Sequence, residues 1–150
     1  GDLADRDERI DRALTDVGLS PGDKSKYIHE FSGGQRQMLA IARALVTRPK
    51  LIVLDEAVSA LDVSIRAQVL DLLAELQARY GLGYLFISHD LHVVRAITDR
   101  VYVMRAGRIV EQGATERVFS APEHAYTKAL IAASPRIPAD WHEGEAIHGT

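Results

Sequence analysis

Two adjacent carboxylates, Asp55 and Glu56, directly follow the short apolar run Leu51–Leu54. A wholly apolar run of this length predicts a strand buried on both faces, and open α/β sheets bind ligands at the carboxyl ends of their strands. Two carboxylates at that position suit phosphoryl transfer, because one can hold Mg²⁺, usually through water, while the other orients and polarises the attacking water. The alternative is a solvated acidic turn, which the preceding apolar run disfavours.

A second candidate site, Ser32-Gly33-Gly34-Gln35, precedes a stretch whose apolar residues recur at helical spacing. At the start of a helix, unpaired backbone N–H groups and the positive end of the helix dipole favour an anion. The two glycines would let the backbone approach a phosphate closely. The same four residues could equally form an ordinary serine N-cap with a glycine turn.

His89 follows another apolar run, Tyr84–Ile87. If both runs are strands of one parallel sheet, joined by a helix, His89 emerges at the same sheet edge as Asp55 and Glu56. This shared edge is the argument for a functional histidine. A histidine in a strand-to-helix turn can also be a plain surface residue, with Asp90 beside it as a helix N-cap.

The segments described above and a fourth one, Ser59-Ala60-Leu61-Asp62, which lies between Glu56 and Tyr84, stand in the order found in the ATP-binding cassette ATPases. The chain resembles that family. The resemblance implies that Ser32-Gly33-Gly34-Gln35 is the signature motif, which contacts the γ-phosphate of ATP held by the partner subunit. Two departures are Phe31, where many members have Leu, and Ala57-Val58, where Pro-Thr is common. Neither the Pro nor the Thr side chain that is lost at 57–58 is needed to bind metal or water.

The same resemblance implies roles for the acidic residues and the histidine. Asp55 matches the magnesium-side carboxylate of the Walker B motif, and Glu56 matches the catalytic base. His89 matches the switch histidine, which contacts the γ-phosphate and helps to place the water. Asp62 belongs to the D-loop, which crosses the dimer interface and couples the two sites, but it is also well placed to cap a helix. The implied cofactors are ATP and Mg²⁺.

The phosphate-binding loop of the family is missing from this chain. The motif G-x-x-x-x-G-K-[ST] needs a Gly-Lys dipeptide, and the sequence contains none. We therefore expect an α/β fold, the C-terminal part of a P-loop (RecA-like) nucleotide-binding domain with part of its helical signature subdomain, and no ATPase activity from this chain alone. The expected divisions are a partial helical subdomain at 1–48, the C-terminal part of the RecA-like core at 49–120, and an extension with a tail at 121–150.

Apolar spacing and turn residues predict the elements that position these side chains. An amphipathic helix with Ile10, Leu14 and Val17 should end at Gly18. An exposed tail is expected after Ser134. The remaining expected elements are helices at 33–48, 63–80 (apolar stripe Ile65, Val69, Leu72, Leu76 and Tyr80), 90–97, 115–119 and 124–133, strands at 51–54 and 84–87, and a hairpin of 101–104 with 108–111.

Composition narrows the possible partners and compartments. The chain has 150 residues, of which 47% are hydrophobic and 26% charged, so it can form a globular core. A net charge of −3 gives no basic footprint, and nucleic acid is not an expected partner. The absence of cysteine excludes disulfides and a cysteine-bound iron–sulfur cluster, and no apolar stretch is long enough to span a bilayer.

A late segment, Ala121–Leu130, indicates the branch of the family. It and the stretch Glu56–Gln68 resemble the dipeptide/oligopeptide (and nickel) importer ATPases, with Ala125 in place of the usual Pro. This resemblance implies an ATPase subunit at the cytoplasmic face of the membrane that energises peptide uptake. Its partners would be a second nucleotide-binding domain, a membrane permease and, indirectly, a substrate-binding protein. The alternatives are a non-transport cassette ATPase and a catalytically incompetent fragment acting only as a binding module.

Overall fold

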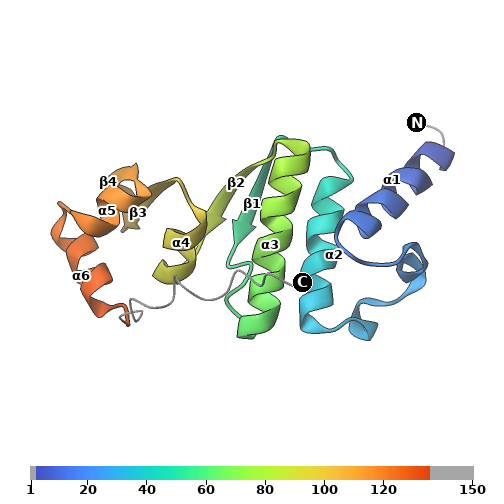
Figure 1. Cartoon of the computed structure of the whole chain (residues 1–150), viewed down its shortest axis with the longest axis horizontal. Helices are drawn as coiled ribbons and strands as arrows, with labels where there is room; N and C mark the ends of the chain where they lie inside the picture. Colours follow the sequence, from blue (N-terminus) through green and yellow to red (C-terminus); the bar gives the residue numbers. More distant parts are fainter. Residues whose placement is uncertain (1–2, 136–150) are drawn as a thin grey trace, which may run out of the picture. The chain divides into compact units, whose positions relative to one another are not determined.

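The computed structural model describes residues 3–135, which divide after His89 into two compact units (Figure 1). Each unit is an independent arrangement of helices and strands. The N-terminal unit contains α1 (Leu3–Asp16), two short 3₁₀ turns η1 (Pro21–Ser25) and η2 (Ile28–Glu30), α2 (Gly33–Leu45), β1 (Leu51–Asp55), α3 (Val63–Tyr80) and β2 (Gly83–Ile87).

The first helix, α1, follows the predicted amphipathic pattern. Its inner face buries Ala13 and Leu14, and Val17 just beyond the helix is also buried. Gly18 has φ +80°, a left-handed conformation that glycine adopts without steric cost, and it ends the helix as predicted.

The strands β1 and β2 pair in parallel, with Leu51 opposite Gly83 and Asp55 opposite Ile87. Helix α3 connects them, so the predicted strand–helix–strand unit is confirmed. The Tyr84 hydroxyl donates a hydrogen bond of 2.8 Å to the Leu73 carbonyl of α3, so that helix packs on one face of the sheet. In Figure 1 the carboxyl ends of both strands and the N-termini of α2 and α3 point toward the same end of this unit.

The prediction that β1 is buried on both faces is wrong. Ile52 and Leu54 are buried, whereas Leu51 and Val53 on the opposite face are 57% and 56% exposed. On β2, Leu85 and Ile87 are exposed on the same face as Leu51 and Val53. The physical reason is that no element among residues 3–135 covers this face closely enough to bury its side chains.

The apolar stripe of α3 also differs from the predicted one. The buried positions are Val69, Leu73 and Leu76, while Tyr80 is 45% exposed. The Tyr80 hydroxyl donates to the Asp16 carboxylate at the end of α1. Helix α3 therefore turns a slightly different face inward than the sequence spacing suggested, because it packs against both the sheet and α2.

The C-terminal unit consists of a hairpin with short helices beside it. Its elements are α4 (Leu91–Ile97), β3 (Arg100–Arg105), β4 (Arg108–Ala114), α5 (Thr115–Ser120) and α6 (Ala125–Ala133). The hairpin turns at Ala106 and Gly107, both with positive φ, as the sequence predicts. The predicted tail after Ser134 lies almost wholly outside the described residues.

The C-terminal unit holds α6 in place through a buried carboxylate. Glu111 on β4 is only 8% exposed and accepts hydrogen bonds of 2.9 Å and 3.0 Å from the backbone N–H groups of Glu123 and His124. The adjacent Thr127 hydroxyl, buried and without another partner among residues 3–135, contributes most to lowering the pKa of Glu111 to about 2, ahead of the Glu123 N–H.

We expect Glu111→Gln to lower the melting temperature of the chain at neutral pH, because the amide cannot replace a carboxylate that accepts from two N–H groups. The pKa of Glu111 is 4.5 ordinarily and about 2 in the fold, so its stabilisation is present above pH 4.5 and is lost as the pH falls toward 2. Melting curves of both proteins should therefore converge across that window. Glu123→Gln, at an exposed carboxylate in the turn before α6, is the control and should show a smaller pH-dependent difference.

Candidate functional site

The N-terminus of α2 is a fully formed capping box. The Ser32 hydroxyl accepts from the Gln35 N–H at 3.2 Å, and the Gln35 side-chain oxygen accepts from the Ser32 N–H at 3.0 Å. Phe31 just before it is buried and anchors the turn. The cap leaves the Ser32 hydroxyl hydrogen and the N–H groups of Gly33 and Gly34 as the donors of this turn, since a helix cannot pair its first N–H groups internally.

The two glycines of this turn have different roles. A Cβ on Gly33 would meet no atom of another described segment within 4 Å, so this residue leaves space at the helix N-terminus. A Cβ on Gly34 would lie 2.6 Å from Cγ2 of Ile65, a distance that real Cβ contacts do not show. The missing side chain of Gly34, which is buried, therefore makes room for α3.

The carboxyl ends of β1 and β2 bring the predicted acidic residues to one edge. Asp55 is the last residue of β1 and is exposed there. Glu56 has φ +53°, a left-handed conformation that is uncommon for a residue with a side chain. Its N–H donates to the Ile87 carbonyl at 2.9 Å, which ties this conformation to the end of β2. Such local strain is typical of functional sites.

Glu56 and His89 are in direct contact. Their Oε1 and Nδ1 atoms lie 3.0 Å apart, although the residues are 33 positions apart in the sequence. The side chains are 39% and 81% exposed, so a ligand can reach both. The contact uses Nδ1 and leaves Nε2 of His89 for a second partner.

The loop between Glu56 and α3 is held by buried side chains and by hydrogen bonds to Glu56. Ala57 and Val58 are buried, with Val58 only 2% exposed, so the pair that departs from the family pattern serves packing. Ser59 donates two hydrogen bonds to the backbone carbonyl of Glu56, from its N–H at 3.3 Å and from its hydroxyl at 3.0 Å.

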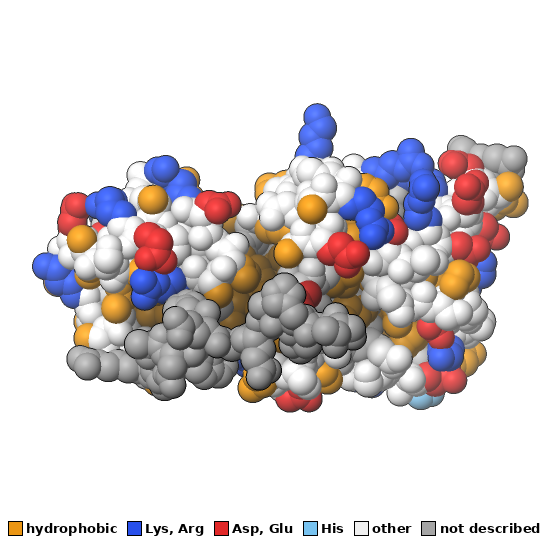
Figure 2. Space-filling view, in the orientation of Figure 1, with side chains coloured by type: hydrophobic (Ala, Val, Ile, Leu, Met, Phe, Trp, Pro, Cys, Tyr) orange, Lys and Arg blue, Asp and Glu red, His pale blue; other side chains and the backbone are white. Residues whose placement is uncertain are grey.

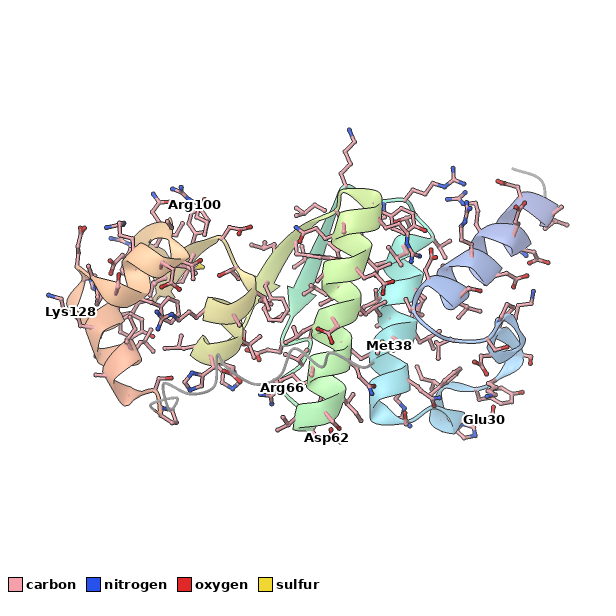
Figure 3. The ribbon with its side chains drawn as sticks, in the orientation of Figure 1. Glu30, Met38, Asp62, Arg66, Arg100 and Lys128 are labelled. Atoms are coloured by element: carbon pink, nitrogen blue, oxygen red, sulfur yellow. The ribbon has the colours of Figure 1, made fainter. Side chains whose placement is uncertain are left out.

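Asp62 is the N-cap of α3. Its Oδ1 accepts from the Ile65 N–H at 3.0 Å and from the Ser64 hydroxyl at 3.1 Å. The Ile65 N–H and then the Ser64 hydroxyl lower the pKa of Asp62, since both stabilise the charged form. Figure 3 shows Asp62 at the N-terminal end of α3. The capping alternative raised from the sequence is thus realised, and Asp62 is also exposed to solvent.

The structure brings the predicted residues together in two groups. Asp55, Glu56 and His89 lie at the strand ends, while the Ser32–Gln35 turn and Asp62 lie at the starts of α2 and α3. Among residues 3–135 no group of three or more His, Asp or Glu side chains could hold a metal by itself. A metal at Asp55 would therefore need water or phosphate oxygens to complete its coordination, which is how Mg²⁺ is commonly bound.

Sequence reasoning missed two contacts of the site. Ile65 covers Gly34, and Ser59 is bonded to Glu56. The second has a local signal, since a serine three residues after a turn residue commonly bonds back to its carbonyl. The contact between Ile65 and Gly34 has no such signal. Isoleucine is common in helices, and only the packing of α3 against α2 shows which residue it touches.

Comparison with known proteins identifies the class. Residues 4–59 match the family model described as ABC transporter, and residues 110–150 match the one described as the C-terminal region of the oligopeptide/dipeptide transporter. Together the two matches cover more than half of the chain. The chain belongs to the ATP-binding cassette transporter family, and its C-terminal segment to the oligopeptide/dipeptide branch, which confirms both resemblances.

The individual relatives are peptide and peptidoglycan transport proteins. The chain is 54% identical over 135 residues to the peptidoglycan transport ATP-binding protein YejF of Agrobacterium fabrum, and 54% identical over 133 residues to the dipeptide transport ATP-binding protein DppF of Haemophilus influenzae. These alignments cover 90% and 89% of this chain but only 25% and 41% of the relatives. The chain thus spans less than half the length of either relative.

A solved structure shares the fold. The ADP conformation of MJ1267, an ATP-binding cassette of an ABC transporter, superposes with a TM-score of 0.71 at 30% identity, over 85% of this chain and 50% of that one. The expected α/β nucleotide-binding fold is thereby confirmed. No helix within residues 3–135 is long and apolar enough to cross a membrane.

Proposed function

We propose that this chain is part of the ATP-hydrolysing subunit of an ABC importer that energises the uptake of peptides across the cytoplasmic membrane. The observation that carries the proposal is the contact of 3.0 Å between Glu56 and His89 at the carboxyl ends of β1 and β2. The strained backbone of Glu56 and the exposure of both side chains support a role toward a ligand.

In the proposed mechanism Glu56 accepts a proton from the attacking water and orients it. His89 holds Glu56 through Nδ1 and directs Nε2 toward the γ-phosphate of ATP. Asp55 would hold Mg²⁺ through water, and the bound metal would neutralise charge on the phosphates. Asp55 is exposed beside Glu56 and belongs to no cluster of three or more ligating side chains among residues 3–135, which suits such a water-mediated site.

The turn Ser32–Gln35, here called the signature turn, would bind the ATP held by a second subunit. Its available donors are the Ser32 hydroxyl and the N–H groups of Gly33 and Gly34, at the positive end of the dipole of a 13-residue helix. Gln35 shapes this turn through the capping box. Asp62, an exposed residue, would contact the partner across the dimer interface.

The phosphate-binding loop would come from a segment that precedes residue 1 in a longer polypeptide. The relatives are more than twice the length of this chain, and the apolar face of β1 and β2 is exposed here. We propose that the additional segment covers this face. The chain then contributes part of the helical subdomain (1–48), the C-terminal part of the RecA-like core (49–120) and the extension with its tail (121–150).

The partners proposed for the complete subunit are a second nucleotide-binding domain, the membrane permease and, through the permease, a substrate-binding protein. The subunit would lie peripherally at the cytoplasmic face of the membrane. A non-transport cassette ATPase is the alternative, but the match of residues 110–150 to the oligopeptide/dipeptide transporter region favours the importer. On the visible face of the N-terminal unit, acidic and basic side chains are interspersed, which gives no support to a nucleic-acid partner (Figure 2).

The chain by itself should not bind Mg-ATP with micromolar affinity or hydrolyse it. Affinity in this class depends on the convergent N–H groups and the lysine of the phosphate-binding loop, and without them Asp55 and Glu56 only repel the phosphates. Calorimetric titration of the 150-residue chain and of the full-length subunit compares the two directly. The full-length protein should bind and the chain should not; micromolar binding by the chain, monomeric by light scattering, would contradict the proposal.

A further inference from the structure

In the first turns of α2 and α3, a side chain of α3 packs directly on the backbone of α2. Gly34 is buried, and a Cβ built on it would lie 2.6 Å from Cγ2, 3.5 Å from Cδ1 and 3.7 Å from Cγ1 of Ile65. The whole end of the isoleucine side chain therefore rests on the Gly34 backbone. A shift of Ile65 would move the first turn of α2, because packed atoms at this distance cannot interpenetrate.

Ile65 is in turn held by the loop before α3. Its N–H donates to Asp62 Oδ1 at 3.0 Å, so the residue that caps α3 also sets the position of the isoleucine. The Ser64 hydroxyl bonds to the same oxygen at 3.1 Å and stiffens this turn. The Ser59–Asp62 loop therefore reaches Gly34 through a single side chain.

The opposite end of the loop is bonded to the acidic residue. Ser59 donates twice to the carbonyl of Glu56, whose N–H is bonded to the end of β2. Hydrogen bonds thus join Ser59 to Glu56 at one end of the loop and Ile65 to Asp62 at the other, and Ile65 packs on Gly34. All of these residues belong to the N-terminal unit.

We propose that Ile65 is a positioning residue for the signature turn, and that its contact with Gly34 transmits the position of the Ser59–Asp62 loop to the N-terminus of α2 in the same subunit. The inference rests on the proposed function, in which the signature turn binds the ATP of a second subunit. Movement of the loop at the dimer interface would then tighten or release the signature turn.

The test is a double-mutant cycle in the full-length subunit with Gly34→Ala, Ile65→Ala and both together. The dimer dissociation constant is measured by analytical ultracentrifugation with a hydrolysis-resistant ATP analogue. Nucleotide affinity of the monomer and its melting temperature are measured in parallel. Gly34→Ala should weaken the dimer at least about tenfold, and adding Ile65→Ala should recover at least about threefold of this loss. Monomer nucleotide affinity should stay within about twofold throughout, because the phosphate-binding loop is untouched.

Two matched variants test whether recovery is specific to the contact. Gly33→Ala makes the same change one residue earlier, where the added Cβ would meet no atom of another described segment within 4 Å, and any loss it causes should not be recovered by Ile65→Ala. Val63→Ala shortens a side chain of the same helix turn that is 70% exposed, and it should not recover the loss caused by Gly34→Ala.

Additive effects in the cycle would overturn the proposal, as would equal recovery by Val63→Ala. If Gly34→Ala alone does not fold, Ile65→Val and Ile65→Ala replace it, and dimer affinity should fall stepwise while the monomer melting temperature changes little. Unchanged dimer affinity in both would also overturn the proposal. Failure of the unmodified subunit to dimerise with the analogue would instead contradict the proposed function itself, so the two failures are distinguishable.

Discussion

Glu56→Gln in the full-length subunit should bind Mg-ATP with near-normal affinity and lose about 10²–10⁴-fold in kcat. The amide keeps the size of the side chain and can still contact His89, but it cannot accept a proton from the attacking water. Steady-state phosphate release gives kcat, and calorimetry under non-turnover conditions gives the affinity. The two measurements separate loss of the base from loss of binding.

The control for this variant is Glu75→Gln. Glu75 is an exposed carboxylate on α3 that pairs with Arg79, away from the strand ends, and its replacement removes the same charge. Its kcat should stay within about threefold of the unmodified subunit. Near-normal turnover by Glu56→Gln would exclude Glu56 as the base and would leave the contact with His89 as a structural feature.

Leu54→Ala and Leu51→Ala should differ strongly in the 150-residue chain, although both remove the same atoms from β1. Leu54 is 5% exposed, and its truncation should lower the free energy of unfolding by about 2–5 kcal/mol. Leu51 is 57% exposed, so its truncation should change that free energy by only about 0.5 kcal/mol. Urea unfolding of the two variants measures both values.

The same pair of variants in the full-length subunit tests what covers the sheet. If the additional segment packs on the exposed face, Leu51→Ala should become destabilising by an amount close to that of Leu54→Ala. The chain alone, with this face open, should also self-associate in light scattering more than the full-length protein does. Equal and small effects of Leu51→Ala in both proteins would show that the face stays open in the complete subunit.

Local features of the structure follow from the sequence, because their contacts join residues a few positions apart. The Ser32 capping box joins residues three positions apart, as does the bond between Asp62 and the Ile65 N–H. The hairpin turn at Ala106-Gly107 needs only two adjacent residues with positive φ, a conformation that glycine adopts readily. The order of the motifs likewise sufficed to name the family, since a motif such as Ser32–Gln35 is identified by residue types at adjacent positions.

The sequence by itself therefore determined the class of protein, the order of its helices and strands, and which residues stand at the strand ends. Tertiary structure alone decided which strand face is buried, how closely Glu56 approaches His89, and that Gly34 lies under Ile65. These contacts join residues about 30 positions apart, and apolar type does not say what will pack against a side chain. The run Leu51–Leu54 is equally apolar on both faces, and only the presence of α3 on one of them, with no described element on the other, separates buried from exposed.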